Sequence, residues 1–358
     1  MTDSDIQIQQ YFWQQNAARR ALRAALDAGR LSRSYLFVGP EGVGKWAAAQ
    51  WVAIALLCEQ RQPDQRPCFA CGGCKRAMRG THPDLHLLFP VPKKDEEEHI
   101  AAFLATKRDD PFAVVRYDRR PNIAVDRVRD LLSELSKTAA EGGNKVAIIG
   151  ACDQMHHDIH GILLKSIEEP PPGAYFILTT ADPGRLPQTI HSRCQTIRFT
   201  AVDPDVIAER LVNEGIADPN QAQMAAHLSD GGWGNALRLC EEDAVAWRGD
   251  VEELWRLAFQ PKMTDFLERS QAMFRGGQKF NETVQAFDIW SLLLWRDTRA
   301  AFGTPTGESH PVLSPPSLDV AWSCWKILQQ GRATLWVNVM PRNAVRGTFL
   351  AIRRRLGY

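Results

Sequence analysis

The chain has 358 residues, 44% of them hydrophobic, and carries 43 Lys and Arg against 42 Asp and Glu. This length favours two or three domains, and the near-zero net charge argues against a nucleic-acid binder that acts through a strongly basic overall field, although a local basic patch stays open. The N-terminus lacks a basic region followed by an apolar core, and no run of about 18 apolar residues occurs, so we expect a cytoplasmic protein without a membrane span.

The first predicted elements lead to a glycine-rich loop. Residues 17–31 place Ala and Leu at helical spacing, which predicts an amphipathic helix, and the apolar run at 34–38 predicts a buried strand. A loop at 39–45 follows and runs into a second helical pattern. Strand, glycine-rich loop and helix is the setting of a phosphate-binding loop, and it favours that interpretation over a turn without a ligand.

Most of the phosphate-loop pattern G-x-x-x-x-G-K-[ST] is present. Gly39, Gly42 and Gly44 let backbone N–H groups face phosphate at the start of the helix, and Lys45 could reach the β- and γ-phosphates. The last position should supply a hydroxyl for magnesium, but it holds Trp46, and an indole has no lone pair to offer a metal ion. We therefore expect a nucleotide cradle without Mg²⁺, and binding of ATP or ADP stays open.

Four of the eight cysteines lie close together in the sequence, at Cys58, Cys68, Cys71 and Cys74. The spacing C-x9-C-x2-C-x2-C suits a closed tetrahedral site for a structural Zn²⁺ ion. In a cytosolic chain this interpretation is favoured over scattered thiols or a redox pair at the last two cysteines, with His82 as the alternative to Cys58. The isolated cysteines are predicted to pack in the core: Cys152, Cys194, Cys240 and Cys324.

The middle of the chain alternates strand-like and helix-like patterns. Residues 84–89 and 145–149 predict strands, and residues 127–137 predict an amphipathic helix. The segment 93–110 is rich in charge, and we expect a solvated insertion there.

The strand at 145–149 lacks the acidic pair of a phosphate-loop ATPase, in which an Asp supports magnesium and a Glu activates the attacking water. The two positions hold Gly150 and Ala151. Asp153 comes later and could substitute only if the register of the strand slipped. Together with Trp46, this gives two independent missing elements, which argue against ATP hydrolysis.

A further helix and strand complete the pattern. Residues 159–168 predict a helix that ends before a proline run, and residues 175–180 predict a strand rich in β-branched and aromatic residues. The segment 190–197 follows and contains Ser192-Arg193-Cys194. Strands that alternate with helices indicate an α/β fold with a parallel sheet.

The rest of the chain is helical in pattern. Residues 206–214 and 220–228 predict two helices, a third begins near 236, and helical patterns continue from about 247, interrupted by a Pro- and Gly-rich loop at 303–317. The tryptophans on these stretches are predicted to pack in the core rather than to stack on bases, because basic residues between them are sparse. They are Trp255, Trp290, Trp295, Trp322, Trp325 and Trp336.

Taken in order, these segments resemble the clamp-loader branch of the AAA+ ATPases, which includes subunits of the bacterial DNA polymerase III clamp loader. The specific resemblance covers about residues 17–199, and the order of the motifs makes it stronger than a lone phosphate loop. The motifs are the loop at 39–45, the cysteine cluster, Thr81-His82-Pro83-Asp84, the run at 163–171, the strand end at Thr180 with Asp182-Pro183, and Ser192-Arg193-Cys194.

The resemblance implies an architecture and partners. It implies an AAA+ α/β core at 1–200 with a zinc-binding module at about 58–74, a small helical lid at 201–245 and an all-α collar domain at 246–358. The implied partners are other clamp-loader subunits, the gamma/tau motor and delta, in a hetero-oligomeric ring. The sliding clamp and primed DNA would be reached through that complex.

The resemblance also implies roles for residues. The arginine of Ser-Arg-Cys serves in the family as an arginine finger for a neighbour's ATP, which implies this role for Arg193, with a local salt bridge as the alternative. Thr180 matches the first nucleotide sensor. Motor subunits keep an intact loop, an acidic pair and a sensing arginine before the stretch that matches Asn235. The chain lacks these, so we expect it to have no intrinsic ATPase activity and to belong with the subunits that do not act as the motor.

Two other functions stay open. The chain could be a divergent, ATP-hydrolysing gamma/tau-like motor subunit of the same machine, which the substitutions at Trp46, Gly150 and Ala151 disfavour. It could also be a stand-alone, zinc-containing nucleic-acid-binding protein, which the near-zero net charge disfavours.

Overall fold

The computed structural model describes residues 10–60, 67–117, 119–141, 143–155, 157–274, 280–303, 312–337 and 339–357. The chain forms two compact units, the first within Met1–Val115 and Pro121–Arg238 and the second within Arg116–Arg120 and Leu239–Tyr358. The predicted division into three domains stays a prediction. Among the described residues, no helix is both long and apolar enough to cross a membrane.

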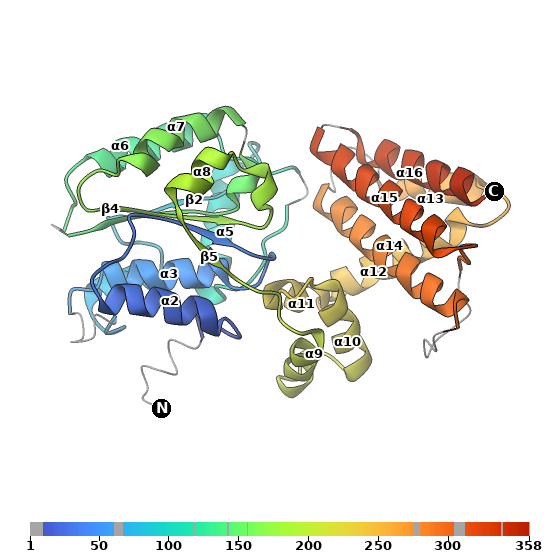
Figure 1. Ribbon diagram of the computed structural model, residues 1–358, viewed down its shortest axis with the longest axis horizontal. Coiled ribbons are helices and arrows are strands. Elements are labelled where there is room, and N and C mark those ends of the chain that lie inside the picture. The colour runs from blue at the N-terminus through green and yellow to red at the C-terminus, as the bar shows by residue number, and fades with distance from the viewer. Residues whose placement is uncertain are drawn as a thin grey trace. The chain divides into compact units, whose positions relative to one another are not determined.

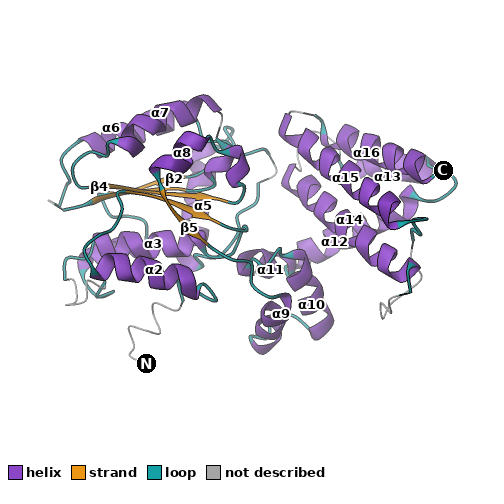
Figure 2. Ribbon diagram, in the orientation of Figure 1, coloured by secondary structure: helices purple, strands orange, loops and turns teal. Residues whose placement is uncertain are grey.

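The first unit is built on a five-stranded parallel sheet (Figures 1 and 2). The strands are β1 (Ser34–Val38), β2 (Leu85–Leu88), β3 (Lys145–Ile149), β4 (Ala174–Thr180) and β5 (Gln195–Arg198), in the order β2-β3-β4-β1-β5. All four pairings are parallel, and every residue of β1 and β3 is buried. Such strands form continuous apolar runs because helices cover both faces. The predicted α/β fold class is confirmed.

Helices cover the sheet on both sides. On one face lie α2 (Asn16–Asp27) and α3 (Lys45–Leu56), and on the other lie α6 (Val125–Ser136), α7 (His157–Glu168) and α8 (Gln188–Arg193) (Figure 1). α3 is buried along its whole length, whereas α2 and α6 each bury one stripe. Two further helices, α4 (Gly72–Met78) and α5 (Glu96–Asp109), lie between β1 and β3 in the sequence.

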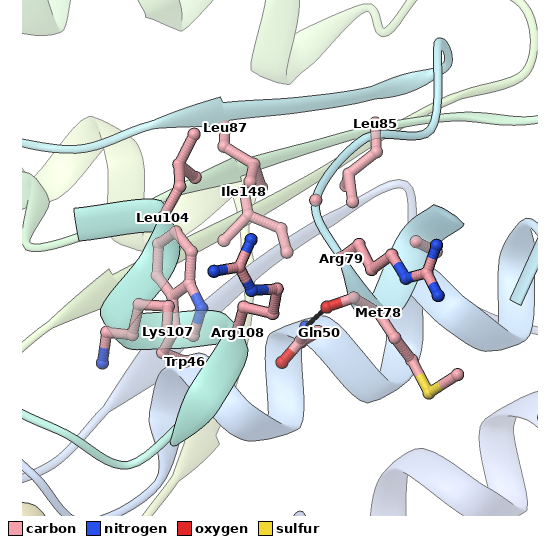
Figure 3. A pocket seen from close by; sticks show the side chains of 12 residues that line it. Trp46, Gln50, Met78, Arg79, Leu85, Leu87, Leu104, Lys107, Arg108 and Ile148 are labelled. Carbon is pink, nitrogen blue, oxygen red and sulfur yellow. Dashed lines mark hydrogen bonds between the residues drawn. The ribbon is translucent and has the colours of Figure 1, made fainter. Parts of the chain in front are cut away.

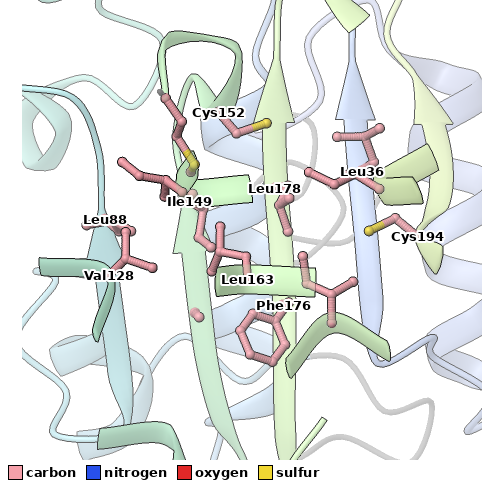
Figure 4. Packing of buried hydrophobic residues seen from close by; sticks show 14 of the residues in the cluster. Leu36, Leu88, Val128, Ile149, Cys152, Leu163, Phe176, Leu178 and Cys194 are labelled. Carbon is pink, nitrogen blue, oxygen red and sulfur yellow. The ribbon is translucent and has the colours of Figure 1, made fainter. Parts of the chain in front are cut away.

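A hydrophobic cluster fixes α6, α7 and α8 to the sheet (Figure 4). Leu36, Ile149 and Leu178 come from three neighbouring strands, and Leu163 comes from α7. The isolated cysteines follow the predicted core packing for the most part. Cys152 and Cys194 are buried in this cluster, Cys324 is buried in the second unit, and Cys240 is half-buried.

Three short helices follow β5, in the segment where the sequence predicts a lid: α9 (Pro204–Asn213), α10 (Pro219–Leu228) and α11 (Trp233–Leu239). Helices α9 and α10 begin with the same N-cap arrangement. Asp203 and Asp218 accept hydrogen bonds from backbone N–H groups of the first turn, and a proline occupies the first helical position.

The second unit is all helical, with α12 (Glu242–Ala258), α13 (Thr264–Met273), α14 (Phe280–Ala301), α15 (Leu318–Thr334) and α16 (Pro341–Leu356). Trp255 and Trp290 are fully buried against Phe349, as predicted. The prediction is wrong for Trp322, which is 46% exposed and stacks on Trp325 with ring centroids 4.6 Å apart.

Two predictions for this unit lie outside the described residues. They are the packing of the Trp336 side chain and most of the loop at 303–317.

Candidate nucleotide site and metal site

The glycine-rich loop joins the end of β1 to the start of α3, as predicted. Gly42 (φ 76°) and Gly44 (φ 106°) adopt left-handed backbone conformations that favour glycine. The Gly39 amide donates to the Thr180 carbonyl at 3.3 Å, which ties the loop to the end of β4. The chain thus keeps the turn of a phosphate loop at the N-terminus of a helix.

The side chain of Lys45, the first residue of α3, turns back onto the loop. The residue is 8% exposed, and its Nζ donates to the carbonyls of Gly39 and Pro40, at 2.5 Å each. Burial lowers the pKa of Lys45 to about 8, against the opposite effect of the Glu41 and Asp153 carboxylates. The ammonium group is therefore held by its own loop.

The indole of Trp46 fills the space beyond the end of β3. Trp46 is 9% exposed and packs edge-on against Phe89 and Phe103, with ring centroids 6.0 and 5.1 Å apart. A Cβ atom at Gly150 would lie 3.0 Å from Cζ3 of Trp46. The two departures from the ATPase pattern, at Trp46 and Gly150, are in contact and form one packing arrangement. From the sequence they are expected to be independent, but the structure shows that they are not.

The prediction of a solvated insertion at 93–110 agrees with the exposure of most charged side chains there, but it missed a helix that packs on the core. The segment contains α5, whose Phe103 stacks on Phe89 with ring centroids 3.7 Å apart and covers Trp46. Nζ of Lys107, one turn later, donates to the Ala113 carbonyl at 2.5 Å, and burial lowers the pKa of this amine to about 8. Only Phe103 of this helix is buried, and the three glutamates of the first turn make the segment resemble a charged loop in the sequence.

A small hollow lies beside Trp46 (Figure 3). Leu104 and Lys107 of α5 line it together with Gln50 of α3, whose Nε2 donates to the Met78 carbonyl at 2.8 Å. Trp46 therefore forms a wall between two helices, at the position where a magnesium-binding phosphate loop carries a hydroxyl.

Asp153 comes close to the loop without a slip of strand register, and whether it can replace the missing acidic pair stays a prediction. Ala151 takes a left-handed conformation (φ 44°), and the 3-10 helix η1 (Cys152–Gln154) brings the carboxylate to the end of β4. This carboxylate accepts hydrogen bonds from the Thr180 hydroxyl at 2.7 Å and the Ala181 amide at 3.1 Å. Burial raises the pKa of Asp153, and these hydrogen bonds oppose that rise. The hydroxyl of Thr180, the residue expected to sense nucleotide, is thus already hydrogen-bonded to Asp153.

Phe112 and Gly234 of α11 cover the phosphate loop. The Gly234 amide donates to the Gly42 carbonyl at 3.0 Å. A Cβ atom at Gly234 would lie 1.9 Å from the Phe112 carbonyl oxygen, and one at Gly44 would lie 2.6 Å from Cε1 of the Phe112 ring. Sequence reasoning missed Phe112, and the closely spaced glycines at 231–234 are the signal that could have indicated a close backbone contact.

The four predicted cysteine ligands form one cluster, and their Sγ atoms all lie within 4.8 Å of one another. The Sγ–Sγ distance is 3.7 Å for Cys58–Cys68 and 3.9 Å for both Cys58–Cys71 and Cys68–Cys74. Four thiolates at the zinc–sulfur distance of about 2.3 Å stand about 3.8 Å apart on a tetrahedron. The cluster therefore fits a tetrahedral metal ion of this size.

Backbone amides donate to sulfur atoms of the cluster. The amide of Cys74 donates to Sγ of Cys71 at 3.3 Å, and the amide of Cys71 donates to Sγ of Cys68 at 3.3 Å. Burial acts to raise the pKa of the Cys71 thiol, but the amides of Cys74 and Glu59 outweigh it and lower that pKa to about 7. This environment favours the thiolate form of Cys71, whereas burial raises the pKa of Cys58 and of Cys74.

His82, the alternative fourth ligand, lies outside the cysteine cluster. Its Nδ1 accepts a hydrogen bond from the Asp84 amide at 3.1 Å, and its Nε2 lies 3.2 Å from the Glu141 carboxylate. Arg76 of α4 contacts the same carboxylate at 2.7 Å. These contacts attach the cysteine module to the segment before β3 and leave Cys58 in the ligand set.

Arg193 is the last residue of α8 and forms an ion pair with Glu168, the last residue of α7. Its Nε lies 2.9 Å from Oε2 of Glu168, and its Nη2 donates to Oε1 at 3.1 Å. The side chain of Arg193 is 31% exposed. The local salt bridge that the sequence left open is present, and a role toward a neighbouring subunit stays a prediction.

Comparison with known proteins gives consistent matches. A family model described as "DNA polymerase III, delta subunit" matches residues 14–203. The chain is 32% identical over 244 residues to DNA polymerase III subunit delta' of Bacillus subtilis (strain 168), covering 68% of this chain and 64% of that protein. It is 30% identical over 239 residues to subunit tau of the same organism, covering 65% of this chain and 37% of that protein.

Among solved structures, a gamma subunit-related protein of Thermotoga maritima matches with a TM-score of 0.43 and 15% identity, covering 93% of this chain and 99% of that one. The matches to the curated relatives span 64% and 37% of their lengths, which is less than two thirds in each case.

Proposed function

The chain belongs to the clamp-loader subunit family of DNA polymerase III, and from this premise we propose that it is a non-hydrolysing stator subunit. It supplies Arg193 to the ATP site of a neighbouring motor subunit while the complex loads the sliding clamp onto primed DNA. Its partners are the gamma/tau motor and delta subunits in a hetero-oligomeric ring.

The contact between Trp46 and Gly150 carries the non-hydrolysing part of this proposal. Hydrolysis at a phosphate loop needs a hydroxyl and a carboxylate for magnesium and a second carboxylate for the attacking water. At these positions the chain has an indole packed against Gly150, followed by Ala151. Asp153 lies nearby, but its carboxylate accepts hydrogen bonds from Thr180 and Ala181, and its pKa is raised by burial.

The position of Arg193 supports its role as a finger. It is partly exposed at the end of a helix whose next residue, Cys194, is buried in the core cluster, so the backbone beneath the guanidinium is fixed. A guanidinium is permanently charged and presents a planar fork of donors, which suits a phosphoryl group in transfer.

The cysteine cluster supports a structural Zn²⁺ held by Cys58, Cys68, Cys71 and Cys74. When bound, such an ion supplies a cross-link and no open coordination position. The residues of the chain then hold the end of α3, the following loop and α4 together.

The test is ATP turnover by the purified chain, by its motor partner, and by the assembled complex. We expect no turnover by the chain alone. In the complex, Arg193→Ala should lower turnover by about 10³-fold or more, since arginine fingers contribute roughly 10³–10⁵. Arg198→Ala, an exposed arginine on β5, is the matched control and should leave turnover unchanged.

Two results would contradict the proposal. Turnover by the chain alone would indicate a motor subunit. Equal turnover with Arg193→Ala and the wild-type chain would reduce Arg193 to its local salt bridge.

A further inference from the structure

Arg193 and Glu168 form a close ion pair. Nη2 donates a hydrogen bond to Oε1 at 3.1 Å, and Nε lies 2.9 Å from Oε2 without making a hydrogen bond of its own. On the other side, Nη1 donates to the Thr189 carbonyl at 3.3 Å. Since a guanidinium has five N–H bonds, these contacts leave donors for a further acceptor while they limit the orientations of the group.

Both partners of this pair stand on fixed backbone. Glu168 directly follows Ile167 on α7, and Arg193 directly precedes Cys194 at the end of α8. Ile167, Cys194 and Ile190 of α8 are all buried in the hydrophobic cluster on the sheet. Figure 1 shows α7 and α8 on the same face of the sheet. The distance between the carboxylate and the base of the arginine side chain is therefore set by core packing.

The pair itself remains accessible to solvent. The side chain of Glu168 is 54% exposed and that of Arg193 is 31% exposed. Exposed ion pairs contribute little to the stability of a fold. The hydrophobic cluster already holds α7 and α8 together on the sheet. The main effect of the ion pair is therefore on the orientation of the guanidinium.

We propose that Glu168 is a positioning residue for Arg193, which holds the guanidinium in the orientation in which it meets the phosphates of a neighbouring subunit. This inference rests on the proposed role of Arg193 as a finger. A free arginine side chain samples many rotamers and must lose that freedom at each encounter, whereas a planar fork that is already held loses less. Glu168 limits these rotamers in advance through its ion pair with the guanidinium.

The chain offers a matched control beside Glu168. Glu169 has the same side chain, is also exposed, and follows the end of α7 directly. Replacement of either residue removes one surface carboxylate, so a general effect of charge appears in both variants. An effect of positioning appears in Glu168 variants alone.

The experiment measures steady-state ATP turnover of the assembled complex with the wild-type chain, Glu168→Ala, Glu168→Gln and Glu169→Ala. We expect Glu168→Ala to lower kcat about tenfold with an unchanged KM for ATP, because misorientation of a catalytic group acts on the chemical step. Glu168→Gln keeps an acceptor oxygen and should recover part of this loss. Glu169→Ala should match the wild-type chain.

Combination with Arg193→Ala separates this inference from the proposed function. If Glu168 acts through Arg193, Arg193→Ala with Glu168→Ala should be no slower than Arg193→Ala alone. If the complex with Arg193→Ala turned over ATP at the wild-type rate, the proposed role of Arg193 as an arginine finger would be contradicted. A large loss for Arg193→Ala together with unchanged or faster turnover for Glu168→Ala would overturn the positioning role alone, and so would equal losses for the Glu168 and Glu169 variants. Thermal unfolding of each chain checks that all variants fold.

Discussion

An indole buries far more apolar surface than the serine or threonine that completes a magnesium-binding phosphate loop. Trp46 contacts Phe89 and Phe103, and a Cβ atom at position 150 would lie only 3.0 Å from its ring. With Trp46 present, an acidic side chain at the end of β3 is therefore disfavoured by crowding. The loss of the metal-binding hydroxyl at position 46 and the loss of the acidic residue at position 150 are therefore linked through the packing of Trp46 against Gly150.

This contact predicts coupling between positions 46 and 150. Gly150→Ala should destabilise the chain by about 1–2 kcal/mol, because its Cβ atom would lie 3.0 Å from the Trp46 ring. In a Trp46→Leu background the same change should stabilise by about 0.5 kcal/mol, since alanine restricts the unfolded chain more than glycine does. Urea unfolding of the four chains measures the free energies.

Gly161 on α7 provides the control, because a Cβ atom there meets nothing within 4 Å. Gly161→Ala should stabilise the chain by about 0.5–1 kcal/mol in both backgrounds. Equal effects of Gly150→Ala with Trp46 and with Leu at position 46 would show that the ring does not exclude a side chain there.

At the scale of elements, the short helix α4 needs support from outside itself. It has seven residues, and isolated helices of this length are not stable in water. Its first turn carries Cys74, and Cys71 caps it, so a metal ion on the cluster would tie the helix to the end of α3. The contacts of Arg76 and His82 with Glu141 attach the module to the rest of the first unit.

This arrangement predicts about one bound zinc ion per chain, measured by elemental analysis. Cys74→Ala should abolish binding, whereas Cys194→Ala, which removes a buried thiol outside the cluster, should retain it. Removal of the ion by a chelator should lower the thermal midpoint by roughly 10 °C, because loss of a structural ion costs several kcal/mol. A folded chain without metal at the same midpoint would exclude a structural site.

At the scale of the whole molecule, the first unit encloses its own phosphate loop. Lys45 donates to two loop carbonyls, the Phe112 ring lies against Gly44, and the Gly234 amide donates to Gly42. In a nucleotide-binding site, phosphate oxygens would take these places. The start of α11 is therefore held on the phosphate loop by contacts of the chain itself.

Thermal unfolding with and without ATP tests this closure. A ligand at a hundred times its Kd stabilises the folded state by about 2.7 kcal/mol, which raises the midpoint by several degrees. We expect no shift for the wild-type chain in millimolar ATP, with or without magnesium. The motor partner, measured in parallel, should shift. A rise in the midpoint of the wild-type chain would show that the loop still binds nucleotide.

The sequence by itself determined the local elements and the residues able to do chemistry. Apolar runs and helical spacing indicated four of the five strands and most of the helices that cover them, and cysteine spacing indicated candidate metal ligands, because such patterns repeat within a short window of the chain. The short strand β5 and the helix α8 before it were not predicted. The helix α5 was missed because its buried face is narrow and follows an acidic turn.

Only the tertiary structure decided which residues meet. The sheet order places β3, β4 and β1 side by side, so residues from distant parts of the chain converge at their carboxyl ends. This convergence brings Trp46 to Gly150 and Asp153 to Thr180, and the packing of α7 and α8 on the same sheet brings Glu168 to Arg193. No local pattern records these contacts, because they depend on the closing of the core around the whole sheet.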